Sequence, residues 1–490
     1  MKTKTLSLTV LLASQIFLLT NCSPSGESKQ SNPDVQVFTG ATALTIQDTS
    51  GNPIPAAQVL IGDSAGVPFT NNLLTADAKG NLTLPSAWTS PATVSISAAG
   101  FVTASFLHST PATHTFKLRK QLGLATVEYS GQTTGYPAFD DFSVAHVSLV
   151  FEALKRSDLA NFSISKIVSP ESDSFSVLGN AVTVPSNLAI PNQTLSYIIH
   201  INVNKPEFRI PLTTSSDHLM IGLHAQFPVT DLVKAVRSKA SIFDMINFFN
   251  FTSVSQQNQH VDTINVNRDV DISKTPINLK NHVQAQKFGA NLVLLAISSF
   301  QQSDALIPLD VKNVASGTSV DLNTLSLTHT SEKTISVLRS SISDVTESGA
   351  SQELMSVAIH DASQTTLPDQ LGILAAPTYN GTNLEQVLPT AQPTNIKMQG
   401  MYYSYNGVAS QTISGVVVET KSPLWDVYNP NWESNATFPT LPSQMTTATL
   451  ASSHRWTVSL LGQDTTTNSD LGPDRLANVN YLTRAAVDFK

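Results

Sequence analysis

The segment Gly62-Asp63-Ser64-Ala65-Gly66 matches the G-x-S-x-G pattern, in which a serine hydroxyl acts as a nucleophile. That chemistry requires the serine on a sharp turn between a strand and a helix, beside backbone N–H groups that stabilise an oxyanion. A strand-like run precedes the motif, but the residues that follow it, VPFTNN, are typical of a β-turn. We therefore interpret the motif as a hairpin loop and expect no catalytic residue in it.

Two histidines, His218 and His224, lie six residues apart in SSDHLMIGLHAQF, with Asp217 beside the first. In a β-strand this separation places both side chains on one face, where they could bind a metal or transfer a proton. Two imidazoles without a third ligand fall short of a zinc site, and His360-Asp361 offers less. The sequence contains no H-E-x-x-H, Walker A, G-x-G-x-x-G or C-x-x-C motif. We expect these histidines to be polar residues of a sheet, and we expect no metal and no cofactor.

Two acidic stretches contain the clustered oxygen ligands that Ca²⁺ prefers in loops. The first stretch alternates Asn267, Asp269 and Asp271. The second stretch groups Asn468, Asp470, Gly472 and Asp474. Both are better explained by turn chemistry, because short polar side chains bond to their own backbone. The sequence leaves a calcium site open but does not predict one.

Aromatic residues gather towards the C-terminal end of the chain. Five of them are candidate ligand-binding residues: Tyr403, Tyr405, Trp425, Tyr428 and Trp432. Strand alternation places Tyr403 and Tyr405 on one face, whereas PLWDVYNPNWESN is typical of a loop that carries the other three. Exposed rings of this kind stack on sugars or fill a pocket of a protein partner. The alternative is that the same rings pack in the core.

The N-terminal residues have the pattern of an export signal. Lys2 and Lys4 precede an apolar run over 6–19, which is shorter than the roughly 20 residues of a membrane span. We therefore expect residues 1–21 to be a signal peptide. Cys22 follows immediately and is the one cysteine of the chain, so no disulfide can form within the chain.

The segment Leu19-Thr20-Asn21-Cys22 resembles the lipobox of bacterial lipoproteins, although that family prefers Gly, Ala or Ser where Asn21 stands. The resemblance implies that Cys22 is lipidated and becomes the first residue after cleavage. Ser23 stands where an aspartate would mark retention in the inner membrane. The resemblance therefore favours the outer membrane, on its periplasmic or its outer face. Residues 22–34 are rich in Ser, Pro and Gly and are expected to form a flexible tether.

The composition excludes several classes of protein. Charged residues make up 13% of the 490 residues, about half of the roughly 25% found in a typical soluble domain. Hydrophobic residues make up 41%, which does not fit a disordered chain of low hydrophobicity and high charge. The net charge of −8 and the lack of a Lys or Arg cluster argue against a nucleic-acid partner. The length suits about two to four domains.

Residues 35–118 alternate short apolar runs with turn signals, as an all-β module does. They resemble the carboxypeptidase regulatory-like (transthyretin-like) β-sandwich, an Ig-like fold, in three motifs that keep the family's order. The matching residues are Gly51, Pro53, Ile54, Pro55, Ala57 and Val59, then Thr75, Asp77, Ala78 and Gly80, then Val94, Ser97, Gly100 and Phe101. The resemblance implies a spacer or interaction domain without catalytic activity.

The remaining residues complete a prediction of a mainly β, multidomain protein with one inserted helix. Residues 120–396 form a β-rich middle region, where apolar residues at helical spacing predict a helix near 230–249. Residues 397–490 form a C-terminal β-domain, where Asn406-Gly407 predicts the turn of a hairpin.

Together these features predict a lipid-anchored protein of the cell envelope with a structural or binding role and no catalytic activity. Its expected partners are the membrane, through the N-terminal lipid, and a glycan or an envelope protein. The alternative is an envelope hydrolase that acts on polysaccharide or peptide, with the N-terminal module as a spacer. A third interpretation is a component of an envelope assembly, which a large exposed apolar patch would favour.

Overall fold

The computed structural model describes residues 43–489 with gaps, and all elements named below lie within the described residues. The gaps fall at 63–72, 87, 122–125, 136–142, 153–167, 178, 190–194, 199–206, 214–218, 239–249, 255–257, 260–262, 266–267, 270–271, 279–292, 303–304, 315–318, 326–332, 346–350, 362–369, 380–382, 390–392, 414–415, 446–453, 466–471, 474–475 and 477–478. The predicted signal peptide at 1–21, Cys22 and the predicted tether at 22–34 lie outside the described residues. Residues Thr42–Lys490 belong to one compact unit.

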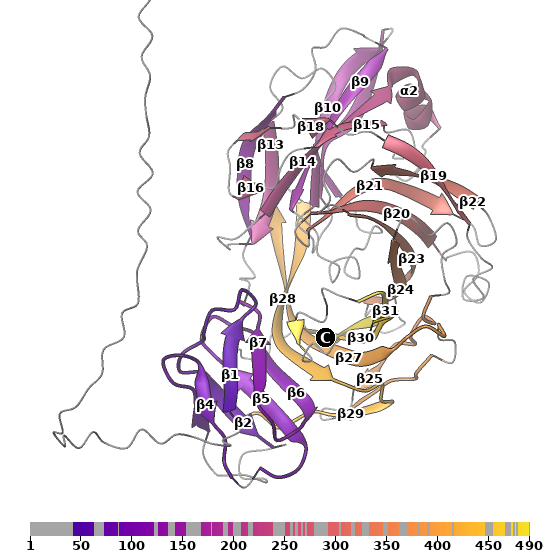
Figure 1. Ribbon diagram of the computed structural model, residues 1–490. Helices are drawn as coiled ribbons and strands as arrows, with labels where there is room; N and C mark the ends of the chain where they lie inside the picture. The colour runs from indigo at the N-terminus through magenta and orange to yellow at the C-terminus, as the bar shows by residue number, and fades with distance from the viewer. Residues whose placement is uncertain are drawn as a thin grey trace, which may run out of the picture. The chain divides into compact units, whose positions relative to one another are not determined.

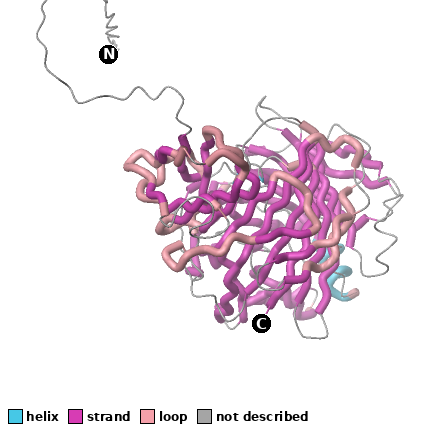
Figure 2. Tube along the Cα trace, turned by 90° about the horizontal axis from the view of Figure 1, so that it is seen from below, coloured by secondary structure: helices cyan, strands magenta, loops and turns pink. Residues whose placement is uncertain are grey.

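The described residues confirm the prediction of a mainly β fold (Figure 1, Figure 2). The N-terminal strands are β1 (Ala43–Asp48), β2 (Gln58–Ile61), β3 (Leu74–Thr75), β4 (Asn81–Thr83), β5 (Ala92–Ser97), β6 (Thr103–Ser109) and β7 (His114–Leu118). The middle elements are β8 (Thr126–Thr134), β9 (Val144–Glu152), β10 (Val168–Val177), β11 (Asn180–Ala189), β12 (Leu195–Ile198), β13 (Glu207–Thr213), β14 (Leu219–Pro228), α2 (Val229–Arg237), β15 (Asn250–Val254), β16 (Asn258–Gln259), β17 (Thr263–Asn265), β18 (Arg268–Asp269), β19 (Ile272–Asn278), β20 (Val293–Gln302), β21 (Ala305–Val314), β22 (Ser319–Leu325), β23 (Lys333–Val345), β24 (Ser351–Asp361), β25 (Thr378–Tyr379) and β26 (Asn383–Glu385). The C-terminal strands are β27 (Met398–Ile413), β28 (Val416–Asn429), β29 (Asn435–Thr437), β30 (His454–Gln463) and β31 (Tyr481–Phe489).

The largest sheet has 12 strands in the order β21-β20-β23-β24-β31-β30-β27-β28-β6-β5-β2-β3. Its neighbouring strands are antiparallel, except that β28 and β6 run parallel. Smaller sheets have the orders β4-β1-β7, β13-β8-β17, β19-β22 and β25-β26-β29, and a further sheet is built around β9 and β14. The large sheet takes strands from all three predicted regions. It therefore continues across both expected boundaries, at 118–120 and at 396–397.

The N-terminal strands form two layers with a shared core. Along β1 the side chains alternate in burial, so that Leu44 and Ile46 are fully buried. β1 pairs in parallel with β7, whose Phe116 lies against Phe106 of β6 with ring centroids 4.4 Å apart. Because β7 belongs to the small sheet and β6 to the large one, this contact packs the two sheets face to face.

A tight turn before β4 contacts β1 of the same small sheet. The Asp77 carboxylate accepts hydrogen bonds from the backbone N–H groups of Lys79 and Asn81, each at 2.8 Å. Gly80 follows with a φ of +72°, which favours glycine. Its carbonyl accepts a hydrogen bond from the backbone N–H of Ile46 at 2.8 Å, so the turn contacts β1 directly. This turn agrees with the turn signals that separate the apolar runs within residues 35–118.

The inserted helix is short where it is described. α2 ends at Arg237, and Ser238 lies in the turn that follows, with its N–H bonded to the carbonyl of Lys234. A helix was expected near 230–249. The residues at 239–249 lie outside the described part, and the next strand begins at Asn250.

The prediction of a hairpin turn at Asn406-Gly407 is wrong. Both residues lie within β27, which pairs with β28 on one side and with β30 on the other. The pairing with β28 continues to the pair Ile413 and Val416. The Asn406 side chain is buried and bonds to the backbone carbonyls of Ser404 and Arg455. Two flanking strands thus override the local turn preference, leaving only an irregularity after Tyr405.

We predict that Gly80→Ala destabilises the protein more than Gly51→Ala. Both glycines have positive φ, where an alanine costs about 1–2 kcal/mol. A Cβ at Gly80 would also overlap the backbone oxygen of Ile46, whereas a Cβ at Gly51 meets nothing within 4 Å. Urea denaturation should therefore show the greater loss for Gly80→Ala, and equal losses for the two variants would contradict this account.

Candidate functional site

Strands β28, β27 and β30 lie side by side and present two different faces. Successive side chains of a strand point to opposite faces of the sheet. Ser404 is paired with Asp426 on one face. On the other face Tyr405 is paired with Trp425 on one side and with Trp456 on the other. The first face is thus polar near β28, and the second face carries a row of three aromatic rings.

On the polar face the Asp426 carboxylate is buried and fully hydrogen-bonded. Its side chain is 2% exposed. It accepts hydrogen bonds from Arg119 Nε and Nη2 at 2.6–2.9 Å, Tyr402 Oη at 2.8 Å, Ser404 Oγ at 3.1 Å and Tyr428 Oη at 3.4 Å. A buried carboxylate is tolerated only when it is paired and hydrogen-bonded in this way.

Arg119 reaches this carboxylate from the chain that follows β7, 307 positions earlier in the sequence. Its side chain is 31% exposed, and its guanidinium lies over the Tyr402 ring, 5.8 Å from the centroid. Burial alone lowers the pKa of Arg119, but the charge of Asp426 outweighs it and holds the pKa above its ordinary value. Burial raises the pKa of the Tyr402 hydroxyl. The cluster therefore consists of one ion pair surrounded by neutral donors.

Further contacts join the same strands. β6 and β28 pair in parallel over 103–106 and 425–428. The Trp425 indole N–H donates to Ser105 Oγ at 3.0 Å. The Phe106 and Tyr428 rings stack with centroids 5.2 Å apart. Backbone, ring and charge contacts thus all connect the N-terminal strands to β28.

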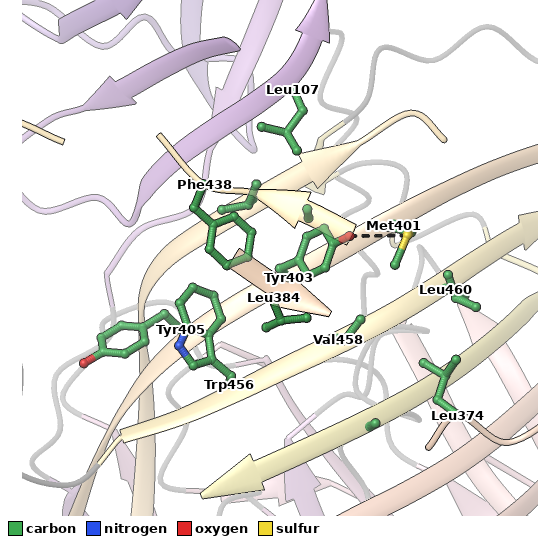
Figure 3. Close-up of a cluster of buried hydrophobic side chains, with 13 residues drawn as sticks. Leu107, Leu374, Leu384, Met401, Tyr403, Tyr405, Phe438, Trp456, Val458 and Leu460 are labelled. Atoms are coloured by element: carbon green, nitrogen blue, oxygen red, sulfur yellow. Dashed lines mark hydrogen bonds between the residues drawn. The ribbon is translucent and has the colours of Figure 1, made fainter. Parts of the chain in front are cut away.

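The aromatic face is covered by residues of and near the small β25-β26-β29 sheet (Figure 3). Phe438 stacks on Trp456 with ring centroids 4.9 Å apart and meets Trp425 edge-on at 5.6 Å. The ring centroid of Tyr379, in β25, lies 5.4 Å from that of Trp456. The ring centroid of Tyr405 lies 5.1 Å from that of Trp456. These rings form a core cluster with Tyr403, Leu384, Val458 and Leu460.

Within the described part of the chain, two buried polar atoms of this cluster have no hydrogen-bond partner, namely Tyr405 Oη and the Trp456 indole nitrogen. Figure 3 shows the Tyr405 hydroxyl pointing away from Phe438, and the indole nitrogen on the side of Trp456 nearest Tyr405. Burial raises the pKa of Tyr405 to about 12. Beside Tyr405, the His454 ring lies 5.1 Å away, and burial lowers its pKa. Both groups are therefore uncharged near neutral pH.

For the three tyrosines the structure agrees with the alternative given by the sequence, in which the rings pack in the core. Tyr403 and Tyr405 are 1% and 5% exposed, and Tyr428 is 1% exposed. Their burial follows from alternation, because Tyr403 and Tyr405 point under the small sheet whereas Tyr428 points to Asp426. PLWDVYNPNWESN also contains the end of a strand, β28, and not only a loop.

The two predicted tryptophans are half-buried. Trp425 lies in the aromatic row, and its N–H is bonded to Ser105. Trp432 lies after β28, and its N–H donates to the backbone oxygens of Gly400 at 3.0 Å and Leu461 at 3.1 Å. The structure therefore brings Trp425 together with Tyr403 and Tyr405, while Trp432 packs at the margin of the cluster.

The other sequence candidates do not gather into a site within the described residues. His224 is fully buried in β14, while His218 lies outside the described residues. The residues at 63–66 of the G-x-S-x-G motif also lie outside them, as do Asn267, Asp271 and the acidic residues near Gly472. Among the described residues, no group of three or more His, Cys, Asp or Glu side chains could hold a metal ion.

Sequence reasoning missed Arg119, Asp426, Tyr379, Phe438 and Trp456 as members of these clusters. A signal for Asp426 did exist, because Trp, Val and Tyr around it favour a strand, and alternation then separates it from Trp425. Arg119 offered no such signal, since nothing local points to a partner 307 positions away.

Comparisons with known proteins do not show a family. No family model matches the chain, and no curated protein matches it. Among solved structures, the chain is similar to BcpA, the major pilin subunit of Bacillus cereus, over 67% of this chain and 97% of that chain. The identity is 9% and the TM-score is 0.15, a value at which the likeness supports no functional conclusion. No helix in the described part of the chain is long and apolar enough to cross a membrane.

We predict that Arg119→Ala lowers the free energy of unfolding by about 3 kcal/mol, because it leaves the buried Asp426 carboxylate without a charged partner. The matched control is Lys234→Ala, which removes the exposed ion pair of Lys234 with Asp231 and should cost less than about 1 kcal/mol. Chemical denaturation of both variants measures the difference. If Arg119→Ala lowers the free energy of unfolding as little as the control does, the contact between the N-terminal strands and β28 (the junction) does not depend on this ion pair.

Proposed function

We propose that the chain is a lipid-anchored protein of the outer membrane, attached through Cys22, with a structural or binding role in the cell envelope and no catalytic activity. The anchor rests on the sequence, where Leu19-Thr20-Asn21-Cys22 follows an export-type apolar run. The polar residues at 22–34 then serve as the tether between the lipid and the folded chain.

The observation that carries the structural role is the pairing of β6 with β28. A spacer module normally connects to its neighbour through a linker and few contacts. Here the N-terminal strands share a sheet with the C-terminal strands, and Arg119 and Asp426 form a buried ion pair across the junction. The folded chain supported by the tether is therefore one continuous body, which suits a load-bearing or ligand-presenting component.

The N-terminal strands also support the proposed relationship to carboxypeptidase regulatory-like modules. β1 to β7 form two packed layers, and turns occupy the positions of the Gly51 and Gly80 motifs. In the hydrolase alternative this module would be a spacer. The β6–β28 pairing instead favours a module that is integral to the body.

The proposed partners are a glycan or an envelope protein, together with the membrane that holds the lipid. Among the described residues, Val387 is the large apolar side chain that stands exposed, at 72%. Assembly through a wide apolar patch is therefore not supported by the described surface. Recognition through aromatic rings and hydrogen bonds has more support, because the described residues include an aromatic cluster with two unused hydrogen-bond donors.

We predict that Cys22→Ser abolishes membrane anchoring. Without the thiol there is no atom to carry the lipid, and the exported protein should move from the detergent phase to the aqueous phase in a Triton X-114 partition. Ser25→Ala, which alters a neighbouring residue without touching the thiol, is the control and should stay in the detergent phase. Retention of the Cys22→Ser variant in the detergent phase would refute the lipid anchor.

A further inference from the structure

The row formed by Trp425, Tyr405 and Trp456 ends in two hydrogen-bond donors that the protein itself does not use. Tyr405 Oη and the Trp456 indole nitrogen are both buried without a hydrogen-bond partner among the residues that the structure describes. Other polar groups of the same cluster are satisfied: Tyr403 Oη donates to Met401 Sδ at 3.3 Å, and the Trp425 N–H donates to Ser105. The two unused donors are therefore local to the end of the row near His454.

Unused buried donors are rare in native proteins, because each one loses its hydrogen bond to water without a replacement. A core that needed only to pack could place phenylalanine at Tyr405 and avoid this loss. Keeping a hydroxyl there indicates that an acceptor reaches it in another state of the protein. Figure 3 shows this hydroxyl directed outward from the cluster and not into it.

Two half-buried rings lie beside the two rings that carry these donors. Tyr379 lies 5.4 Å from Trp456, and His454 lies 5.1 Å from Tyr405. Both rings are only partly buried. Side chains at partly exposed positions change rotamer on a fast timescale. A shift of Tyr379 or His454 would therefore give a ligand access to the aromatic faces and to the two donors without unfolding the strands.

The chemistry of this end of the row favours one class of ligand. Its side chains are aromatic or neutral, since burial lowers the pKa of His454 and raises that of Tyr405. A neutral environment does not favour an anion. A neutral sugar ring has an apolar face for stacking and hydroxyl oxygens that accept hydrogen bonds, which matches aromatic faces combined with O–H and N–H donors.

We infer that the end of the row at Tyr405, Trp456, His454 and Tyr379 binds a neutral sugar unit of a glycan. The sugar stacks on Tyr379 and accepts hydrogen bonds from Tyr405 Oη and the Trp456 N–H. Trp432, which the sequence nominated, takes no part because its N–H is bonded to backbone oxygens. The inference deepens the binding role in the proposed function and rests on it.

The test compares the full chain with Tyr405→Phe, using cellohexaose and chitohexaose as probes in titration calorimetry and tryptophan fluorescence. The wild-type protein should bind at least one hexasaccharide saturably. Tyr405→Phe should weaken that binding about tenfold, which corresponds to about 1.4 kcal/mol. The same variant should be at least as stable as the wild type, because the lost hydroxyl has no partner in the free protein.

Tyr403→Phe is the matched control, since it removes a hydroxyl on the same face of the same strand that is already bonded, to Met401. It should bind like the wild type. Tyr379→Ala removes the half-buried stacking surface and should also weaken binding. Absence of binding to both hexasaccharides, or equal affinities for Tyr405→Phe and wild type, would overturn the inference. Either result would leave the lipid anchor standing, because partition of the Cys22→Ser variant tests it separately.

Discussion

The buried carboxylate of Asp426 requires a partner of opposite charge. It lies on β28 with a side chain that is 2% exposed, and an uncompensated carboxylate there would cost several kcal/mol. Arg119 supplies the compensating charge, and Tyr402 adds a donor that also accepts from Arg119. This ion pair joins the chain after β7 to β28, which is also the strand that pairs with β6. The pairing of the N-terminal strands with the rest of the large sheet is consistent with this one electrostatic constraint.

The same three strands serve two purposes because a strand has two faces. The polar face of β27 and β28 carries Ser404 and Asp426 and makes the junction. The opposite face carries the aromatic row, which packs beneath the small sheet. Because the two faces share one backbone, a shift of the backbone at one face also moves the side chains on the other face. The contacts on the polar face therefore also help to position the aromatic rings on the opposite face.

Local turns could be predicted from the sequence, whereas the pairing of strands far apart in the chain could not. The Asp48 carboxylate accepts hydrogen bonds from the backbone N–H groups of Ser50 and Asn52, which is the turn chemistry that aspartate favours. Asn406-Gly407 has equally strong turn chemistry, yet it is held straight because strands flank it on both sides. A turn preference is worth about 1 kcal/mol or less, and two ladders of backbone hydrogen bonds exceed it. The sequence left both exposure and core packing open for the aromatic residues, and the burial of Tyr403 and Tyr405 depends on a small sheet that no local pattern predicts.

The parallel pairing of β6 with β28 also determines the order in which the chain can fold. Arg119 and Asp426 are 307 positions apart, so the contact closes a very long loop and raises the contact order. Until β28 arrives, the outer edge of β6 presents unpaired backbone groups to any other strand nearby. A chain made from its N-terminus onward passes through a stage in which its first module is formed but one edge is open. An open strand edge of this kind is a place where strands of other molecules can pair before the chain is complete.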